Sequence, residues 1–173
     1  MKNKLKIINY EKGFTYIEAI IYVTIISIML ISIIPFAWDI IEGGTQSAVQ
    51  QEVSSNARYI SERIKYEIRN ASGINSVSPS SISLANSNNG TIDPTIITFT
   101  SPNITIKQGL GSAVNLNSND VTITGFSFIN DTAANNSTKD ITFGFTARQT
   151  FAGSRADFKS TMSVSSSAEL RSH

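Results

Sequence analysis

The chain has 173 residues, contains no cysteine and is sparsely charged, with 16% charged side chains and a formal net charge of +1. The absence of cysteine excludes disulfide bonds and thiolate chemistry. The net charge is unevenly distributed, because four lysines lie within the first thirteen residues, where only Glu11 opposes them: Lys2, Lys4, Lys6 and Lys12. The rest of the chain has ten basic and twelve acidic side chains. It therefore has no general electrostatic attraction for nucleic acid.

An apolar run of 21 residues follows this basic segment, at positions 14–34, and Glu18 is its only charged residue. As a helix the run would be ~30 Å long, which matches the hydrocarbon core of a bilayer. Because the lysines precede it, we expect a single-pass protein of the cytoplasmic (inner) membrane, with its N-terminus in the cytoplasm and its C-terminal domain outside. A cleaved secretory signal is the alternative, but its apolar core is shorter and ends at small residues, whereas Pro35 and Trp38 follow here.

The helix is expected to continue beyond the membrane, with residues 14–35 as its transmembrane half and residues 36–73 as an amphipathic soluble half. Pro35 lacks an amide hydrogen and predicts a helix kink, and Gly43-Gly44 marks a second weak point. In the soluble half, apolar residues recur at spacings of three and four, which predicts one buried stripe. Its members are Val49, Val53, Ala57, Ile60, Ile64 and Ile68.

The charged residues of this soluble half lie largely outside the stripe. Arg58/Glu62 and Arg63/Glu67 are pairs of opposite charge four residues apart, a spacing that brings side chains together on a helix. Gly73 is the expected end of the helix.

Residues 74–173 are expected to form a β-rich globular domain. Short segments alternate β-branched or aromatic residues with polar ones, and clusters of Asn, Ser and Gly separate them, which predicts half-buried strands and turns. The predicted strands centre on positions 82–84, 96–99, 104–106, 114–116, 121–123, 126–128, 141–145 and 162–164. We expect an α+β fold in which the helical stripe covers one face of an antiparallel sheet, with a frayed tail over Ser165–His173.

The start of the apolar run reads Lys12-Gly13-Phe14-Thr15-Tyr16-Ile17-Glu18. A basic leader, a Gly-Phe junction, one acid four residues further on and a long apolar run together resemble the type III signal of prepilins, the precursors of type IV pilins. The resemblance covers the first fifth of the chain, and Tyr16 departs from the family's commoner leucine. A long helix followed by a β-rich domain is also what this family shows.

The resemblance implies that residues 1–13 are a prepilin leader, that a prepilin peptidase cuts between Gly13 and Phe14, and that Phe14 becomes the N-methylated first residue. It also implies a role for Glu18 in filament assembly and a helix kink at Pro35. Three later stretches resemble minor pilins of the W type and minor pseudopilins of the J type: residues 57–69, residues 121–128 followed by 141–145, and residues 163–171.

Glu18 is a candidate functional residue on physical grounds as well, because a carboxylate inside a membrane helix is costly. One interpretation pairs it with the Phe14 amine of a neighbouring subunit, so that the two charges compensate each other in a filament core. The alternative is an interfacial residue in the first helical turn, where the helix dipole favours an acid.

Catalytic and metal sites are poorly supported. The only histidine is His173, the last residue, so the common histidine-based nucleophile and zinc constellations are missing, and we expect a protein that is not an enzyme and has no cofactor. Asp131 and Asp140 are interpreted as solvated loop acids rather than a catalytic pair. The segment 117–120, Asn-Ser-Asn-Asp, carries oxygen ligands suited to calcium, but a plain turn is the favoured interpretation.

The expected function is that of a structural minor pilin or pseudopilin of a type IV pilus, a type II secretion system or a DNA-uptake filament. Its partners would be a prepilin peptidase, other pilin or pseudopilin subunits and inner-membrane lipid. The alternative is a binding module whose β-domain captures DNA, a surface or a cargo. Basic and aromatic residues interleave near the last strands and would suit nucleic acid, although an aromatic core row beside exposed basic side chains is favoured. They are Phe145, Arg148, Phe151, Arg155, Phe158 and Lys159.

Overall fold

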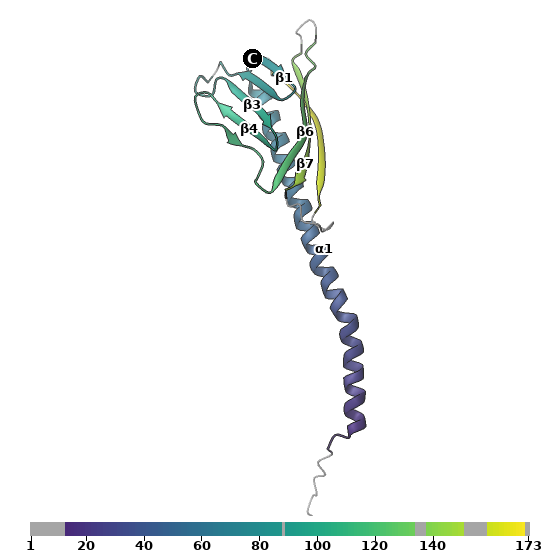
Figure 1. Ribbon diagram of the computed structural model, residues 1–173. Helices are drawn as coiled ribbons and strands as arrows, with labels where there is room; N and C mark the ends of the chain where they lie inside the picture. Colours follow the sequence, from purple (N-terminus) through teal and green to yellow (C-terminus); the bar gives the residue numbers. More distant parts are fainter. Residues whose placement is uncertain (1–12, 88, 134–137, 151–158, 172–173) are drawn as a thin grey trace, which may run out of the picture. The chain divides into compact units, whose positions relative to one another are not determined.

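The protein is known from a computed structural model, which describes residues 13–87, 89–133, 138–150 and 159–171. One long helix, α1 (Tyr16–Asn70), precedes the β-strands (Figure 1). The chain divides into two compact units, the first ending at Glu42 and the second beginning at Gly43, so the division falls inside α1.

In the first unit, the described chain is helical from Tyr16 onward, as the apolar run predicted. Pro35 and the Gly43-Gly44 pair lie inside α1 and do not end it. The kink expected at Pro35 concerns the direction of the helix axis, and it stays a prediction. At its other end, α1 stops at Asn70 rather than at Gly73, because Gly73 already opens the first strand.

The second unit combines the rest of α1 with two antiparallel sheets, rather than the one sheet expected. The five-stranded sheet has the order β1-β2-β3-β4-β5, and the three-stranded sheet has the order β6-β7-β8. Within each sheet every strand pairs with the next one along the chain, so no crossover connection is needed. The bounds are β1 Gly73–Ser78, β2 Ser81–Ala85, β3 Thr95–Thr100, β4 Asn103–Gln108, β5 Val114–Asn115, β6 Val121–Asn130, β7 Asp140–Gln149 and β8 Thr161–Glu169.

The core lies between the second half of α1 and both sheets. The predicted stripe is confirmed for Val53, Ala57, Ile60, Ile64 and Ile68, which have no exposed surface, while Val49 at its start is half-buried. The same core takes fully buried side chains from both sheets, among them Ile82, Leu84, Ile97 and Ile104 from one and Ile123, Ile141 and Phe143 from the other. Burial of this apolar surface is the main force that holds the helix to the sheets.

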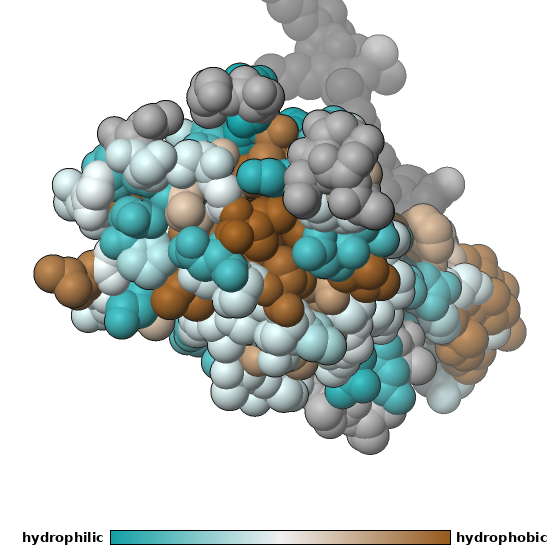
Figure 2. All heavy atoms as spheres, turned by 90° about the horizontal axis from the view of Figure 1, so that it is seen from above, coloured by the Kyte–Doolittle hydropathy of each residue, from teal (hydrophilic) through white to brown (hydrophobic). Residues whose placement is uncertain are grey.

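An aromatic cluster around Phe126 joins the two sheets. The ring centroid of Phe126 lies 5.5 Å from that of Phe99 in the five-stranded sheet. It lies 4.7 Å from that of Phe128 and 6.0 Å from that of Phe145, both in the three-stranded sheet. These separations are typical of favourable ring–ring contacts. The surface of this unit seen in Figure 2 mixes hydrophilic and intermediate residues around a smaller apolar area.

Two expectations about the strands were wrong in detail. β1 was missed because its sequence, GINSVS, has only two apolar residues and its side chains are half-buried or exposed. The predicted strands at 121–123 and 126–128 form one strand, β6, with a register shift between Thr124 and Ser127. Gly125 within that shift has a φ of +61°, a backbone conformation that glycine adopts without strain.

The tail expected to fray from Ser165 is instead ordered through the described residues. Ser165–Glu169 belong to β8 and pair with β7, and the Leu170 N–H donates to the Lys139 carbonyl at 2.9 Å. Leu170 itself is buried. The sequence Ser-Ser-Ser-Ala-Glu lacks the alternating apolar residues that mark a strand, so backbone pairing with β7 decides its conformation.

Candidate functional site

The start of α1 is fixed by Thr15, which acts as the N-terminal cap. The Glu18 N–H donates to the Thr15 side-chain oxygen at 3.4 Å, and the Ala19 N–H donates to the Thr15 carbonyl at 3.1 Å. Capping satisfies amides that the first helical turn leaves without a partner. Thr15 and Glu18 also have the spacing of a capping box, a sequence signal that marks the start of a helix.

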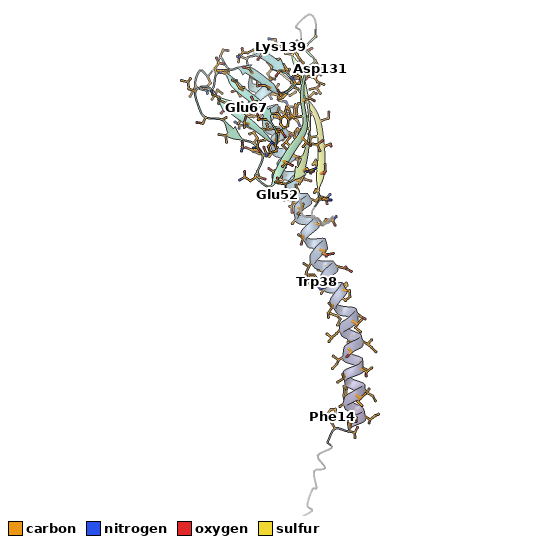
Figure 3. All side chains as sticks on the ribbon, in the orientation of Figure 1. Phe14, Trp38, Glu52, Glu67, Asp131 and Lys139 are labelled. Carbon is orange, nitrogen blue, oxygen red and sulfur yellow. The ribbon has the colours of Figure 1, made fainter. Side chains whose placement is uncertain are left out.

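The junction at Gly13 and Phe14 lies just outside this capped turn. A Cβ added at Gly13 would meet no atom within 4 Å, so the fold itself does not require glycine there. Phe14 is 74% exposed, and its ring centroid lies 5.7 Å from that of Tyr22, eight residues further along the chain. The peptide bond between Gly13 and Phe14 is therefore accessible to another protein (Figure 3).

Glu18 is half-exposed and lies in the first turn of α1, where the helix dipole favours its negative charge. Among the described residues, no ion pair to its carboxylate is present. The next basic residue along the sequence after Lys12 is Arg58, forty residues beyond Glu18. A compensating charge for Glu18 therefore has to come from the N-terminal segment or from another molecule.

The apolar half of α1 is exposed along its length. Phe14, Ile26, Trp38 and the other large apolar side chains as far as Ile41 are between 46% and 84% exposed (Figure 3). The hydroxyl groups within it are satisfied by the helix, because Thr24, Ser27 and Ser32 donate to the carbonyls of Ile20, Val23 and Ile28 at 2.8, 2.7 and 3.3 Å. This helix is long and apolar enough to span a membrane, a property that secretory signals share.

The segment 117–120 is a structural turn. Asn117 is buried; its side-chain oxygen accepts the Ile104 N–H at 3.0 Å, and its amide donates to the Asn103 side chain at 3.0 Å and to the Val121 carbonyl at 2.7 Å. Its side chain is thus committed to joining β4 to β6. Within the described ranges, no group of three or more His, Cys, Asp or Glu side chains is placed to hold a metal ion.

The remaining candidate residues do not converge. Asp131 and Asp140 meet only through their backbones, with the Asp131 N–H donating to the Asp140 carbonyl at 3.0 Å. Phe145 is buried in the core, whereas Arg148 and Lys159 are exposed, which agrees with an aromatic core row beside basic surface residues. Phe151, Arg155, Phe158, His173 and the leader residues 1–12 lie outside the described residues.

Glu67 is a buried acid whose environment was not foreseen. Its carboxylate accepts hydrogen bonds from Arg63 at 2.7 Å and from Gln108 of β4 at 3.2 Å, beside a hollow of about 250 Å³. Burial raises the pKa of Glu67, and Arg63 and Gln108 oppose that rise. The Arg63/Glu67 pair was predicted from its spacing, but Gln108 is 41 residues away in sequence. The other predicted pair does not form, because Glu62 binds Lys65 at 2.9 Å instead of Arg58.

Comparisons with known proteins add no family to these observations, since no family model, curated protein or solved structure matches the chain.

Proposed function

We propose that this protein is a structural subunit of a type IV pilin-like filament, anchored in the inner membrane before it assembles. The observation that carries the proposal is the division of α1 into two halves. One half is apolar and exposed and follows the Gly13-Phe14 junction, and the other is buried beneath a β-rich domain. The first half needs a covering that the described part of its own chain does not supply, either lipid or the equivalent helices of other subunits.

Processing of the precursor is the first step that we propose for this subunit. A prepilin peptidase would cut between Gly13 and Phe14 and methylate the new Phe14 amine. The accessible junction supports this step, because the peptidase would not have to unwind α1 to reach it. The open space around Gly13 also means that glycine there would serve the peptidase rather than the fold.

Assembly is the second step, and it gives Glu18 its role. In the membrane, the Phe14 amine and the Glu18 carboxylate both lie near the start of α1, within reach of lipid headgroups and water. In a filament core both charges would be removed from water, and each would need an opposite charge from the same or a neighbouring subunit. Neither the W-type minor pilin nor the J-type minor pseudopilin role is favoured over the other by Glu18.

Assembly of a Glu18→Ala variant tests the proposal. We expect normal cleavage, membrane insertion and β-domain folding, but loss of most filament incorporation, because the amine would be left without a partner at a cost of several kcal/mol in the assembled state only. Glu18→Asp is the matched control, which keeps the charge, shortens its reach and should be partly tolerated. Filaments are counted, or secretion or DNA uptake measured, in cells that carry only the variant. Wild-type assembly by Glu18→Ala would contradict the proposed pairing.

A further inference from the structure

The outer strands of the two sheets differ in how their edges are protected. Proteins usually protect such edges by making them short, by a bulge or by a covering element. Among the described strands, β5 has only two residues, and β1 and β6 each contain a register shift. β8 has nine residues and pairs with β7 without any shift, and Figure 1 shows it as the outermost strand of its sheet. β8 therefore lacks these three forms of edge protection in the described chain.

The pairing between β7 and β8 determines which backbone groups of β8 reach its free edge. The Gln149 N–H donates to the Ser160 carbonyl at 3.1 Å, and the Leu170 N–H donates to the Lys139 carbonyl at 2.9 Å, so Ser160 and Leu170 face β7. In an antiparallel ladder this direction alternates from residue to residue. The odd-numbered residues of β8 therefore direct both N–H and C=O outward: Thr161, Ser163, Ser165, Ser167 and Glu169.

These outward groups have no backbone partner within the described part of the chain, where β7 is the only strand beside β8. The side chains leave room for a partner, since β8 contains no proline, lysine or arginine, and its single charge, Glu169, lies at its end. Met162 and Val164 lie on the face of β8 that packs against the core, yet both are only half-buried. A strand placed along this edge would cover their open sides.

We propose that the free edge of β8 binds an extended segment of another protein, which adds to the sheet as a further antiparallel strand. An extended polypeptide is the ligand whose alternating N–H and C=O groups match this row. The segment would carry apolar side chains beside Met162 and Val164, small or polar ones opposite the serines, and no acid beside Glu169.

The β8 strand of a second copy is not the proposed occupant. In Figure 1, β8 and the second half of α1 run in the same direction. An antiparallel β8–β8 pairing would therefore turn the second half of the second copy's α1 the opposite way, whereas neighbouring subunits of the proposed filament point the same way. The common direction of neighbours rests on the proposed function, whereas the free edge itself does not.

Amide hydrogen exchange of the full chain in detergent micelles tests the edge directly. The probe is a peptide with the sequence of Ile141–Gln149, because β7 is the strand with which β8 already pairs and this segment leaves out Asp140, the acid opposite Glu169. A scrambled peptide is its control. In the free chain, the outward amides of Ser163, Ser165 and Ser167 should exchange fast, and those of Val164 and Ser166 slowly. The peptide should slow the outward amides by about tenfold or more and leave the others unchanged.

A proline placed on the edge supplies the matched variants. Ser165→Pro removes an outward N–H without touching the pairing to β7, so the chain should fold while peptide affinity falls about tenfold. Ser165→Ala should bind as the wild type does. If Ser165→Pro fails to fold, Ser163→Pro and Ser167→Pro make the same test.

Four results would overturn the inference. They are slow exchange of the outward amides in the free chain, no binding of the peptide to the wild type, unchanged binding to a folded proline variant, and protection that depends on protein concentration without peptide. The last result would place a second copy on the edge. None of these variants touches the Gly13-Phe14 junction. If the β8 edge does not bind the peptide, the proposed processing at this junction is therefore unaffected and is tested by a separate measurement.

Discussion

The two halves of α1 contain the same kind of apolar residue in opposite surroundings. Ile26 in the first half is 54% exposed, whereas Ile60 in the second half has no exposed surface. In the first half apolar residues occupy all sides of the helix, and in the second half they form one stripe with polar residues elsewhere. The pattern around the helix, rather than apolar content alone, therefore indicates whether a helix is to be covered by its own domain or by something outside it.

The largest effect should come from placing a charge in the covered half. Ile60→Asp would bury a carboxylate without a partner among Val53, Ala57 and Ile64, and we expect a loss of several kcal/mol that unfolds the β-rich unit. Ile26→Asp makes the same chemical change in the exposed half. It should leave the unit folded and weaken only membrane association. Chemical denaturation followed by circular dichroism measures the first effect, and membrane fractionation measures the second. An equal loss of stability in the two variants would contradict the contrast between the exposed and the buried half of α1.

A smaller but still large effect is expected at Asn117 in the second unit. Asn117→Ala would leave the buried Ile104 N–H and Val121 carbonyl without their side-chain partner, at a cost of about 3 kcal/mol. Asn119→Ala, at an exposed position of the same turn, should change the free energy of unfolding by less than about 0.5 kcal/mol. Both variants are compared by urea denaturation with and without calcium. Stabilisation of the wild type by calcium that Asn117→Ala abolishes would favour a metal site over a structural turn.

The smallest effect concerns Glu67 and depends on pH. Burial raises its pKa above the usual 4.5, so the folded chain holds this proton more tightly than the unfolded chain. The contribution of protonated Glu67 to the stability of the fold is therefore complete below its pKa in the unfolded chain. It is lost as the pH rises through its raised pKa in the folded chain. Relative to Glu67→Gln, the wild type should gain stability as the solution is acidified through this window. Denaturation of both proteins from pH 7 to pH 4 measures the difference, and a difference that does not change with pH would show that Glu67 is not perturbed.

Local and periodic features of this fold could be predicted from the sequence. The 3.6-residue period identified Ile60, Ile64 and Ile68 as core residues, because a helical face depends only on spacing along the chain. The α+β class followed from the change to alternating segments after the helix, and it is confirmed.

Features that depend on contacts between distant segments could not be predicted. The strands divide into two sheets, and Phe99 and Phe126 pack between these sheets, a contact that no sequence spacing encodes. Burial of Glu67 needs Gln108, and the strand conformation of Ser165–Glu169 needs β7 as its partner. In the candidate site, a local sequence motif was sufficient to identify the Gly13-Phe14 junction and Glu18. The partners that would complete the site belong to other molecules and could not be predicted from this chain.

The intact mass of the protein extracted from membranes tests the central claim most directly, because it reports where the chain begins. We expect a chain that starts at Phe14 and carries one methyl group on its amine. Gly13→Ala should reduce this processing while the fold stays unchanged, since the space around position 13 is open. A chain that retains Met1, or one cut after residue 34 as a secretory signal would be, would contradict the account.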